Sequence, residues 1–211
     1  MITLFWNPKS RAARMFWALA EVRQPYALVP IDIATDRDAR TDPPAFLSAS
    51  PLRKLPAIID GDARVADSAA IALYLADRYA PGELAPLPDD PARGEFLFWL
   101  FYTPSAIEPA MTEKFARFPP NPVAYPWGSF ELMLAAIEAR LDGRDWLAAE
   151  RFTMADFMVA SALDFMRSFG MLEPSARVAA YIARCTARPA AVEGRRRLAE
   201  ATAALDAGGQ G

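Results

Sequence analysis

The first eighty residues alternate between short apolar runs and segments with apolar residues at helical spacing. Residues 2–5 form an apolar run that ends at Asn7-Pro8, which predicts a strand followed by a turn. In residues 12–22 the apolar positions recur at the spacing of one helix face. Residues 26–33 predict a second strand, and residues 43–48 predict a short irregular helix. Because a helix joins the first two strands, we expect these strands to be parallel.

A hairpin and a further helix complete this part of the chain. Residues 56–59 and 63–65 predict two strands joined at Asp60-Gly61, a dipeptide typical of tight turns. Asp67-Ser68 predicts the start of a helix, whose inner face carries Ile71, Tyr74, Leu75 and Tyr79. The order of elements is therefore βαβαββα, which indicates an α/β domain over residues 1–80.

The composition changes after residue 80. Residues 81–91 are rich in proline and glycine, which is typical of a linker between domains. Beyond this linker the pattern is helical throughout, over residues 96–118 (with a bend near Pro104 and Pro109), 129–141, 153–169, 174–186 and 189–205. We therefore predict an all-α helical-bundle domain over residues 92–205 and a flexible tail over residues 206–211.

The sharpest local signal lies at the start of the third of these helical segments, residues 153–169. Thr153 precedes Asp156 by three residues, the spacing of a capping box, in which each side chain accepts a hydrogen bond from the other residue's backbone amide. Phe152 and Phe157 occupy the two positions of a hydrophobic staple. We assign Thr153 and Asp156 a structural role.

Composition narrows the possible chemistry. The 211 residues include no histidine and one cysteine. These counts exclude Ser-His-Asp and Cys-His relays, zinc sites that need histidine, and redox pairs of cysteines. Cys185, on a late helix, is expected to be a small buried apolar residue. The chemistry must therefore use hydroxyls, carboxylates, backbone amides, Arg, Lys or a bound co-substrate, and we expect no metal.

Charge and hydropathy give expectations about location. The chain has 23 Lys and Arg against 26 Asp and Glu, a net charge of −3, which argues against broad nucleic-acid binding. The apolar residues 1–6 precede Lys9, Arg11 and Arg14, which is the wrong order for a signal peptide. The sequence contains no apolar run of the ~20 residues that span a bilayer. We expect a cytoplasmic protein that binds neither nucleic acid nor a membrane.

Four short segments carry a resemblance that covers nearly the whole chain. They are residues 7–11 (Asn-Pro-Lys-Ser-Arg), 50–57 (Ser-Pro-Leu-Arg-Lys-Leu-Pro-Ala), 67–71 (Asp-Ser-Ala-Ala-Ile) and 151–156 (Arg-Phe-Thr-Met-Ala-Asp). The last three are similar to the Asn-Pro-x-Gly-Lys-Val-Pro-Ala, Glu-Ser-x-Ala-Ile and Phe-Ser/Thr-x-Ala-Asp motifs of the glutathione S-transferase family. Arg53, Leu55 and Asp67 replace the usual Gly, Val and Glu. The resemblance implies a thioredoxin-like first domain and glutathione as co-substrate.

The resemblance also implies where glutathione binds. In the family the proline corresponding to Pro56 is cis, and the backbone of the preceding residue, here Leu55, pairs with the cysteinyl backbone of glutathione. Asp67 and Ser68 open a helix, whose unpaired amides favour a carboxylate such as that of the γ-glutamyl group. Lys54 is a candidate for the glycyl carboxylate. Each of these residues also has an ordinary structural interpretation, as an edge-strand proline, a helix cap or a solvated loop lysine.

The thiol-activating residue is left open among three candidates. Ser10 can donate its hydroxyl proton to the sulfur and so stabilise the thiolate, but it is equally suited to cap the helix that follows. Asn7 and Arg11 are competing donors. Activation by a hydrogen bond needs no base on the protein, which fits a chain without histidine.

The resemblance leaves the reaction less defined than the binding of glutathione. It implies a glutathione S-transferase that presents a small apolar electrophile on its helical domain, where Tyr102 is the candidate contact, and it implies a homodimer. Two alternatives remain. One is a glutathione-dependent disulfide reductase or isomerase, which needs no cysteine of its own. The other is a non-catalytic module that binds glutathione or a protein partner.

Overall fold

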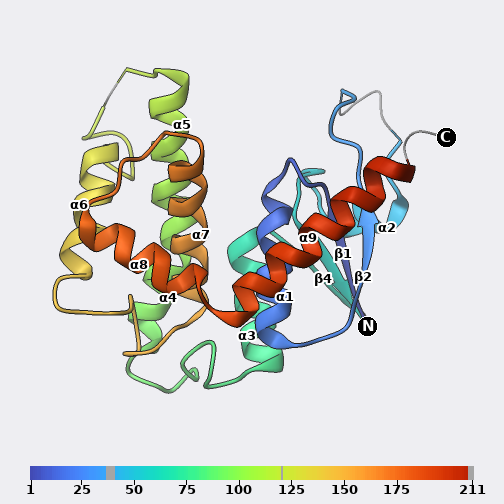
Figure 1. Ribbon diagram of the computed structural model, residues 1–211, viewed down its shortest axis with the longest axis horizontal. Coiled ribbons are helices and arrows are strands. Elements are labelled where there is room, and N and C mark those ends of the chain that lie inside the picture. Colours follow the sequence, from blue (N-terminus) through green and yellow to red (C-terminus); the bar gives the residue numbers. More distant parts are fainter. Residues whose placement is uncertain (37–40, 120, 209–211) are drawn as a thin grey trace. The chain divides into compact units, whose positions relative to one another are not determined.

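The chain folds into two units, which are described separately (Figure 1). The computed structural model describes residues 1–36, 41–119 and 121–208. The first unit joins Met1–Tyr79 with the last helix, α9 (Pro189–Gly208), and the second unit is Ala80–Arg188. This grouping differs from the expected domain boundaries in one element, since α9 packs with the first unit. Of the expected tail, residues 206–208 belong to α9, and residues 209–211 lie outside the described residues.

A four-stranded mixed sheet forms the centre of the first unit. Its strands are β1 (Ile2–Trp6), β2 (Tyr26–Pro30), β3 (Ala57–Asp60) and β4 (Ala63–Ala66), in the order β2-β1-β3-β4. The pairing of β1 with β2 is parallel, as predicted, and the pairings of β1 with β3 and of β3 with β4 are antiparallel. β2 is shorter than predicted, because it ends at a proline, which has no amide hydrogen to donate.

The helices of the first unit lie where the pattern predicts them, with one subdivision. The segment after β1 begins with a 3-10 turn, η1 (Arg11–Arg14), and continues as α1 (Met15–Val22). The short predicted helix is α2 (Pro44–Ala49), and the helix after the hairpin is α3 (Ser68–Tyr79). The βαβαββα order of the α/β domain is therefore confirmed.

A glycine explains why α9 belongs to the first unit. In Figure 1, α9 runs along α1, although about 170 residues separate them in the sequence. A Cβ atom added at Gly194 would lie 2.6 Å from both N and Cα of Trp17. These are backbone atoms of α1, which cannot move aside as a flexible side chain does. The two helix backbones can therefore approach this closely only because residue 194 is glycine.

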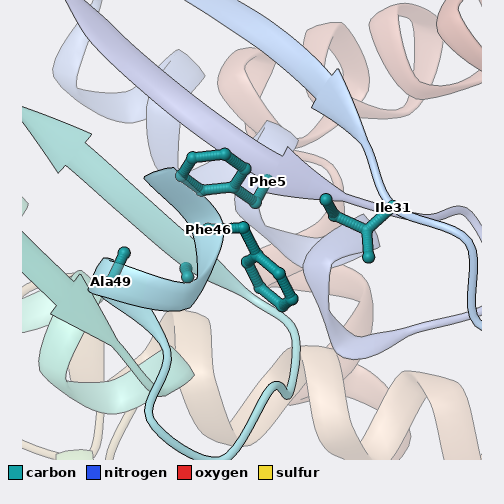
Figure 2. Packing of buried hydrophobic residues seen from close by; sticks show 5 residues of the cluster. Phe5, Ile31, Phe46 and Ala49 are labelled. Carbon is teal, nitrogen blue, oxygen red and sulfur yellow. The ribbon is translucent and has the colours of Figure 1, made fainter. Parts of the chain in front are cut away.

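A small apolar cluster fixes α2 to the sheet. Its buried members are Phe5, Ile31, Phe46, Ala49 and Ala57. Figure 2 shows Phe46 of α2 next to Phe5 and Ile31, and the Phe5 and Phe46 ring centroids are 5.5 Å apart. The half-buried side chain of Leu55 packs against the same cluster. The segment between α2 and β3 is thus anchored in the core at both of its ends.

The second unit contains five α-helices among its described residues. They are α4 (Arg93–Tyr102), α5 (Glu108–Ala116), α6 (Phe130–Arg140), α7 (Met154–Ser168) and α8 (Ala176–Thr186). A π-helical turn, η2 (Thr103–Ile107), separates α4 from α5 and contains Pro104, so the helical segment is interrupted near the proline where a bend was predicted. The predicted helical bundle is confirmed. Within the described residues, no helix is both long enough and apolar enough to cross a membrane.

The capping box at the start of α7 is present as predicted. Thr153 Oγ1 accepts from the Ala155 amide, and Asp156 Oδ2 accepts from the Thr153 amide at 2.9 Å. Asp156 Oδ1 also accepts from the Leu147 amide, which extends the cap to the loop before the helix. The start of α7 is therefore fixed by local bonds as well as by packing.

Candidate functional site

Three segments with predicted site residues lie at one end of the sheet. Phe5 of β1 is paired with Ala57 of β3, and Ala57 is paired with Ala66 of β4. The turn after β1, the segment before β3 and the start of α3 therefore leave the sheet at the same end. Neighbouring strands are ~5 Å apart, so these segments lie close enough to contact one small ligand.

The segment before β3 presents main-chain groups. The Leu55–Pro56 peptide bond is cis, as expected. The main chain of Lys54 is held by Ser50, whose Oγ accepts from the Lys54 amide at 2.9 Å and donates to the Lys54 carbonyl at 2.8 Å. The Leu55 side chain packs on the core. Within residues 1–36, 41–119 and 121–208, neither the Leu55 amide nor its carbonyl has a hydrogen-bond partner. Leu55 thus offers one donor and one acceptor, as the free edge of a strand does.

The start of α3 presents a hydroxyl. Ser68 is 4% exposed, and its Oγ has no hydrogen-bond partner within the described chain. Asp67 before it has a φ of 77°, and its Oδ1 accepts from the Ala69 amide at 2.9 Å, so Asp67 caps the helix. A buried hydroxyl without a partner is uncommon, because desolvation of a polar group costs free energy unless it forms a hydrogen bond. Together with the partial positive charge of the helix start, this hydroxyl is suited to a carboxylate.

The turn after β1 presents an amide. Asn7 Nδ2 donates to the Ile31 carbonyl at 2.9 Å, and Asn7 Oδ1 accepts from the Lys9 amide at 3.0 Å. These two partners fix which atom is nitrogen and which is oxygen. An amide nitrogen carries two hydrogens, and the second one of Asn7 has no partner among the described residues. Asn7 therefore keeps one donor for a ligand.

Ser10, by contrast, has its hydroxyl proton engaged. Ser10 Oγ donates to the Asn7 carbonyl at 2.8 Å and accepts from the Ala12 amide at 3.2 Å, which makes it the N-cap of η1. The capping role anticipated for Ser10 is confirmed. A hydroxyl has a single proton, so a bond from Ser10 to a sulfur requires that the bond to Asn7 be broken.

The two cationic candidates, Arg11 and Lys54, are exposed. Arg11 lies on η1, and Lys54 lies in the loop before β3. Both are at the end of the sheet where the other candidates lie, since Arg11 follows Asn7 by four residues and Lys54 precedes Leu55. A carboxylate in this region would meet these cations through solvent-exposed contacts, which are individually weak.

Tyr102, the predicted substrate contact, lies in the second unit and is mostly buried. Its hydroxyl donates to the Met133 carbonyl at 3.0 Å, and burial raises the pKa of this phenol. Its ring contacts those of Phe98 and Trp99, with centroids 5.4 and 5.0 Å away. Phe98 is exposed. The hydroxyl of Tyr102 therefore anchors α4 to α6. Only the ring of Tyr102 is available for the predicted contact with a substrate.

The sequence pattern did not assign a role to Ser50, although it begins the second quoted segment. Ser50 is buried, and its function is visible only from its contacts with Lys54. Among the described residues, no three His, Cys, Asp or Glu side chains are grouped so that they could hold a metal ion. The site as a whole presents hydrogen-bonding groups for an extended, peptide-like ligand with a carboxylate.

Two domain models of one protein family match this chain. Residues 5–83 match the model of the glutathione S-transferase N-terminal domain, and residues 125–184 match that of the C-terminal domain. The chain is 30% identical over 175 residues to glutathione S-transferase 3 of Schizosaccharomyces pombe, covering 74% of this chain and 70% of that protein. It is 26% identical over 169 residues to the disulfide-bond oxidoreductase YfcG of Escherichia coli, covering 74% and 76%.

A solved structure shows the same fold. It is a glutathione transferase from Phanerochaete chrysosporium with oxidized glutathione, which superimposes with a TM-score of 0.77 over 96% of both chains at 20% identity.

Proposed function

Since the chain belongs to the glutathione S-transferase family, we propose that its first unit binds glutathione and activates the thiol. One observation carries the proposal. The unpaired main chain of Leu55 and the unpaired hydroxyl of Ser68 lie at the same end of the sheet, which is also where Asn7 keeps a free donor. A tripeptide thiol with a terminal carboxylate supplies partners for all three.

Each part of glutathione has a counterpart in this set. The cysteinyl backbone pairs with the Leu55 amide and carbonyl like an added strand. The γ-glutamyl carboxylate accepts from the Ser68 hydroxyl and the first amides of α3, and Asp67 accepts from the ammonium group. Lys54 is the partner we assign to the glycyl carboxylate.

For the thiol we favour Asn7 over Ser10 and Arg11. The amide of Asn7 has an uncommitted hydrogen, whereas the Ser10 proton is donated to the Asn7 carbonyl. A donor close to the sulfur stabilises the thiolate and lowers the pKa of the thiol, which is about 8.5 for a free cysteine. In the reaction, the thiol proton leaves to solvent and the sulfur forms a bond to an electrophilic carbon. The leaving group departs with its bonding electrons.

The experiment separates these donors. The ultraviolet absorbance of the thiolate of enzyme-bound glutathione, followed as the pH is changed, gives the thiol pKa in the wild type and in variants. We expect Asn7→Asp, which keeps the acceptor for Lys9 but loses the donor, to raise the thiol pKa. Ser10→Ala should leave the thiol pKa unchanged and lower stability by about 1 kcal/mol, the usual cost of a lost N-cap. A raised thiol pKa in Ser10→Ala with none in Asn7→Asp would reverse the assignment.

A second candidate function is reduction of disulfides, which the similarity to the oxidoreductase of Escherichia coli favours. Cys185, the one cysteine of the chain, is fully buried, and burial raises the pKa of its thiol. The electrons would therefore come from two glutathione molecules, which reduce one disulfide to two thiols and leave as oxidized glutathione. Turnover of a model disulfide by Cys185→Ala, without conjugation of an arene, is the result that would establish this function.

The quaternary structure and the compartment complete the proposal. Family membership supports a homodimer and a cytoplasmic location. Light scattering of the purified protein tests the first, and a mass of one chain would contradict it. Retention of glutathione without turnover on a panel of electrophiles and disulfides would favour the non-catalytic alternative.

A further inference from the structure

The loop between α2 and β3 contains an arginine in an unusual backbone conformation. Arg53 has a φ of 53°, in the left-handed region that residues with a side chain seldom adopt. Its side chain is held, since Arg53 Nε donates to Asp42 Oδ2 at 2.7 Å. The Asp42 side chain is 2% exposed, so this ion pair is largely shielded from water. The loop thus keeps a strained residue and ties it to a buried carboxylate.

Ser50 ties the same loop to α2. Its amide donates to the Phe46 carbonyl at 2.9 Å, and its carbonyl accepts from the Arg53 amide at 2.9 Å. Its hydroxyl holds both main-chain groups of Lys54. Phe46 belongs to the apolar cluster of Figure 2, so these bonds connect the loop to the core.

These contacts act on the residue that follows. Lys54 is fixed through its main chain, and the Leu55 side chain is fixed by the apolar cluster. The main-chain groups of Lys54 are paired, whereas the amide and carbonyl of Leu55 remain unpaired within the described residues. The loop is therefore held on both sides of the two groups that face a ligand.

We propose that Ser50 and the Asp42–Arg53 ion pair are positioning groups that hold the Leu55 main chain in the geometry that binds glutathione. The proposal rests on the proposed function. None of the three residues needs to touch glutathione, because each acts through the loop. Their contribution is to order the loop before the ligand arrives, so that binding does not have to order it.

The chemistry of the loop gives a specific test. Glycine adopts a positive φ without strain, so Arg53→Gly keeps the backbone conformation accessible but removes the tether and leaves the loop freer. We expect the dissociation constant for glutathione to rise about tenfold, the size of the ordering cost of a loop. Because the loop acts equally in the ground state and the transition state, kcat at saturating glutathione should stay within about twofold.

Two further variants make the test decisive. Ser50→Ala removes the hydroxyl that holds Lys54 and should weaken glutathione binding by a similar factor, with faster amide exchange at Lys54 in the free protein. Ser48→Ala is the matched control: Ser48 lies on α2, is exposed, and bonds the Ala45 carbonyl, so its loss should leave binding unchanged. Circular dichroism of each variant confirms that it is folded.

The outcomes distinguish the two proposals. Weaker binding in both Arg53→Gly and Ser50→Ala, with kcat retained, supports the positioning role. Wild-type affinity in both folded variants overturns the positioning role and leaves glutathione binding intact. A wild-type protein to which glutathione does not bind in calorimetry overturns the proposed function, and this inference with it.

Discussion

Two buried aspartates, one in each unit, have opposite titration behaviour. Asp60, at the end of β3, is 6% exposed. Its carboxylate accepts hydrogen bonds from the phenols of Tyr79 and Tyr74, the latter at 2.9 Å. Arg78 Nε lies 3.1 Å from the same carboxylate. Burial acts to raise the pKa of Asp60, but these hydrogen bonds and the Arg78 charge outweigh it and lower the pKa. The carboxylate of Asp60 is therefore charged at neutral pH.

Asp156 in the second unit accepts more hydrogen bonds but has a higher pKa. Its donors are the amides of Leu147 and Thr153 and the hydroxyls of Thr153 and Tyr181, at 2.9 to 3.2 Å. Complete burial nevertheless raises the pKa of Asp156 to about 6. No cation is paired with it within the described residues. The difference teaches that two phenols and a cation near the surface can outweigh the desolvation of a carboxylate, whereas four neutral donors in a fully buried site do not.

The largest effect should come from removing Asp156. Asp156→Ala leaves two amides and two hydroxyls without their acceptor in a dry core, where each unsatisfied donor is costly. We expect the free energy of unfolding at pH 7 to fall by about 4 kcal/mol. Urea denaturation followed by circular dichroism measures it.

A matched control lies on the same helix. Asp164 pairs with Arg167 on the surface of α7, so Asp164→Ala should cost no more than about 0.5 kcal/mol. If Asp156→Ala cost as little as this control, the buried network would contribute nothing beyond a surface pair.

The pH dependence of stability gives the next largest effect. The folded-state pKa of Asp156, about 6, lies above its ordinary value of 3.8. The folded state therefore binds the proton more tightly, and the contribution of Asp156 to stability is full below pH ~4 and is lost as the pH rises to ~6. The loss is up to about 3 kcal/mol.

Asp156→Asn isolates this titration, because the amide does not ionise. The stability of the wild type relative to Asp156→Asn should fall between pH 4 and pH 7. A relative stability that rises over this range would mean that the four donors outweigh burial, and the two aspartates would then behave alike.

Asp60 should show a smaller effect of opposite sign. Its folded-state pKa is lowered, so its contribution is present above its ordinary pKa and is lost as the pH falls below ~4. At pH 7 we expect Asp60→Asn to cost about 2 kcal/mol, since two phenols lose a charged acceptor but can turn to water. Asp62→Ala, in the adjacent exposed turn, is the control and should be nearly neutral.

The same pair shows which interactions the sequence could predict. The role of Asp156 follows from Thr153 three residues before it, a spacing that is readable in the sequence. Asp60 is predicted only as a turn residue, because its partners Tyr74 and Tyr79 lie 14 and 19 residues away. The sequence also did not predict the packing of α9 on α1, because Gly194 and the Trp17 backbone beside it are far apart in the sequence.

In the candidate site, too, short motifs predicted some features, and others depend on contacts that no motif marks. Leu55 and Ser68 were identified from short motifs, and the structure leaves them with unpaired groups. The motif around residues 7–11 did not reveal that Ser10 donates its proton to the Asn7 carbonyl, because the direction of a hydroxyl depends on the fold of the turn. The Asp42–Arg53 pair was missed as well, since it joins residues 11 apart on either side of α2, and no sequence motif marks this pairing.

The smallest effect should come from the cation that distinguishes the two aspartates. Arg78 is half exposed, and its guanidinium also lies 5.9 Å from the ring centre of Tyr74 and 5.6 Å from that of Tyr79. Because water and salt screen an exposed pair, we expect Arg78→Met to lower stability only slightly at low salt, and less at high salt. Arg78→Lys, which keeps the charge, is the control. Arg78→Met should also raise the pKa of Asp60. The fall in stability at acid pH reports this change. An unchanged fall in Arg78→Met would show that the phenols alone keep Asp60 charged, and the contrast with Asp156 would then rest on the depth of burial and not on the cation.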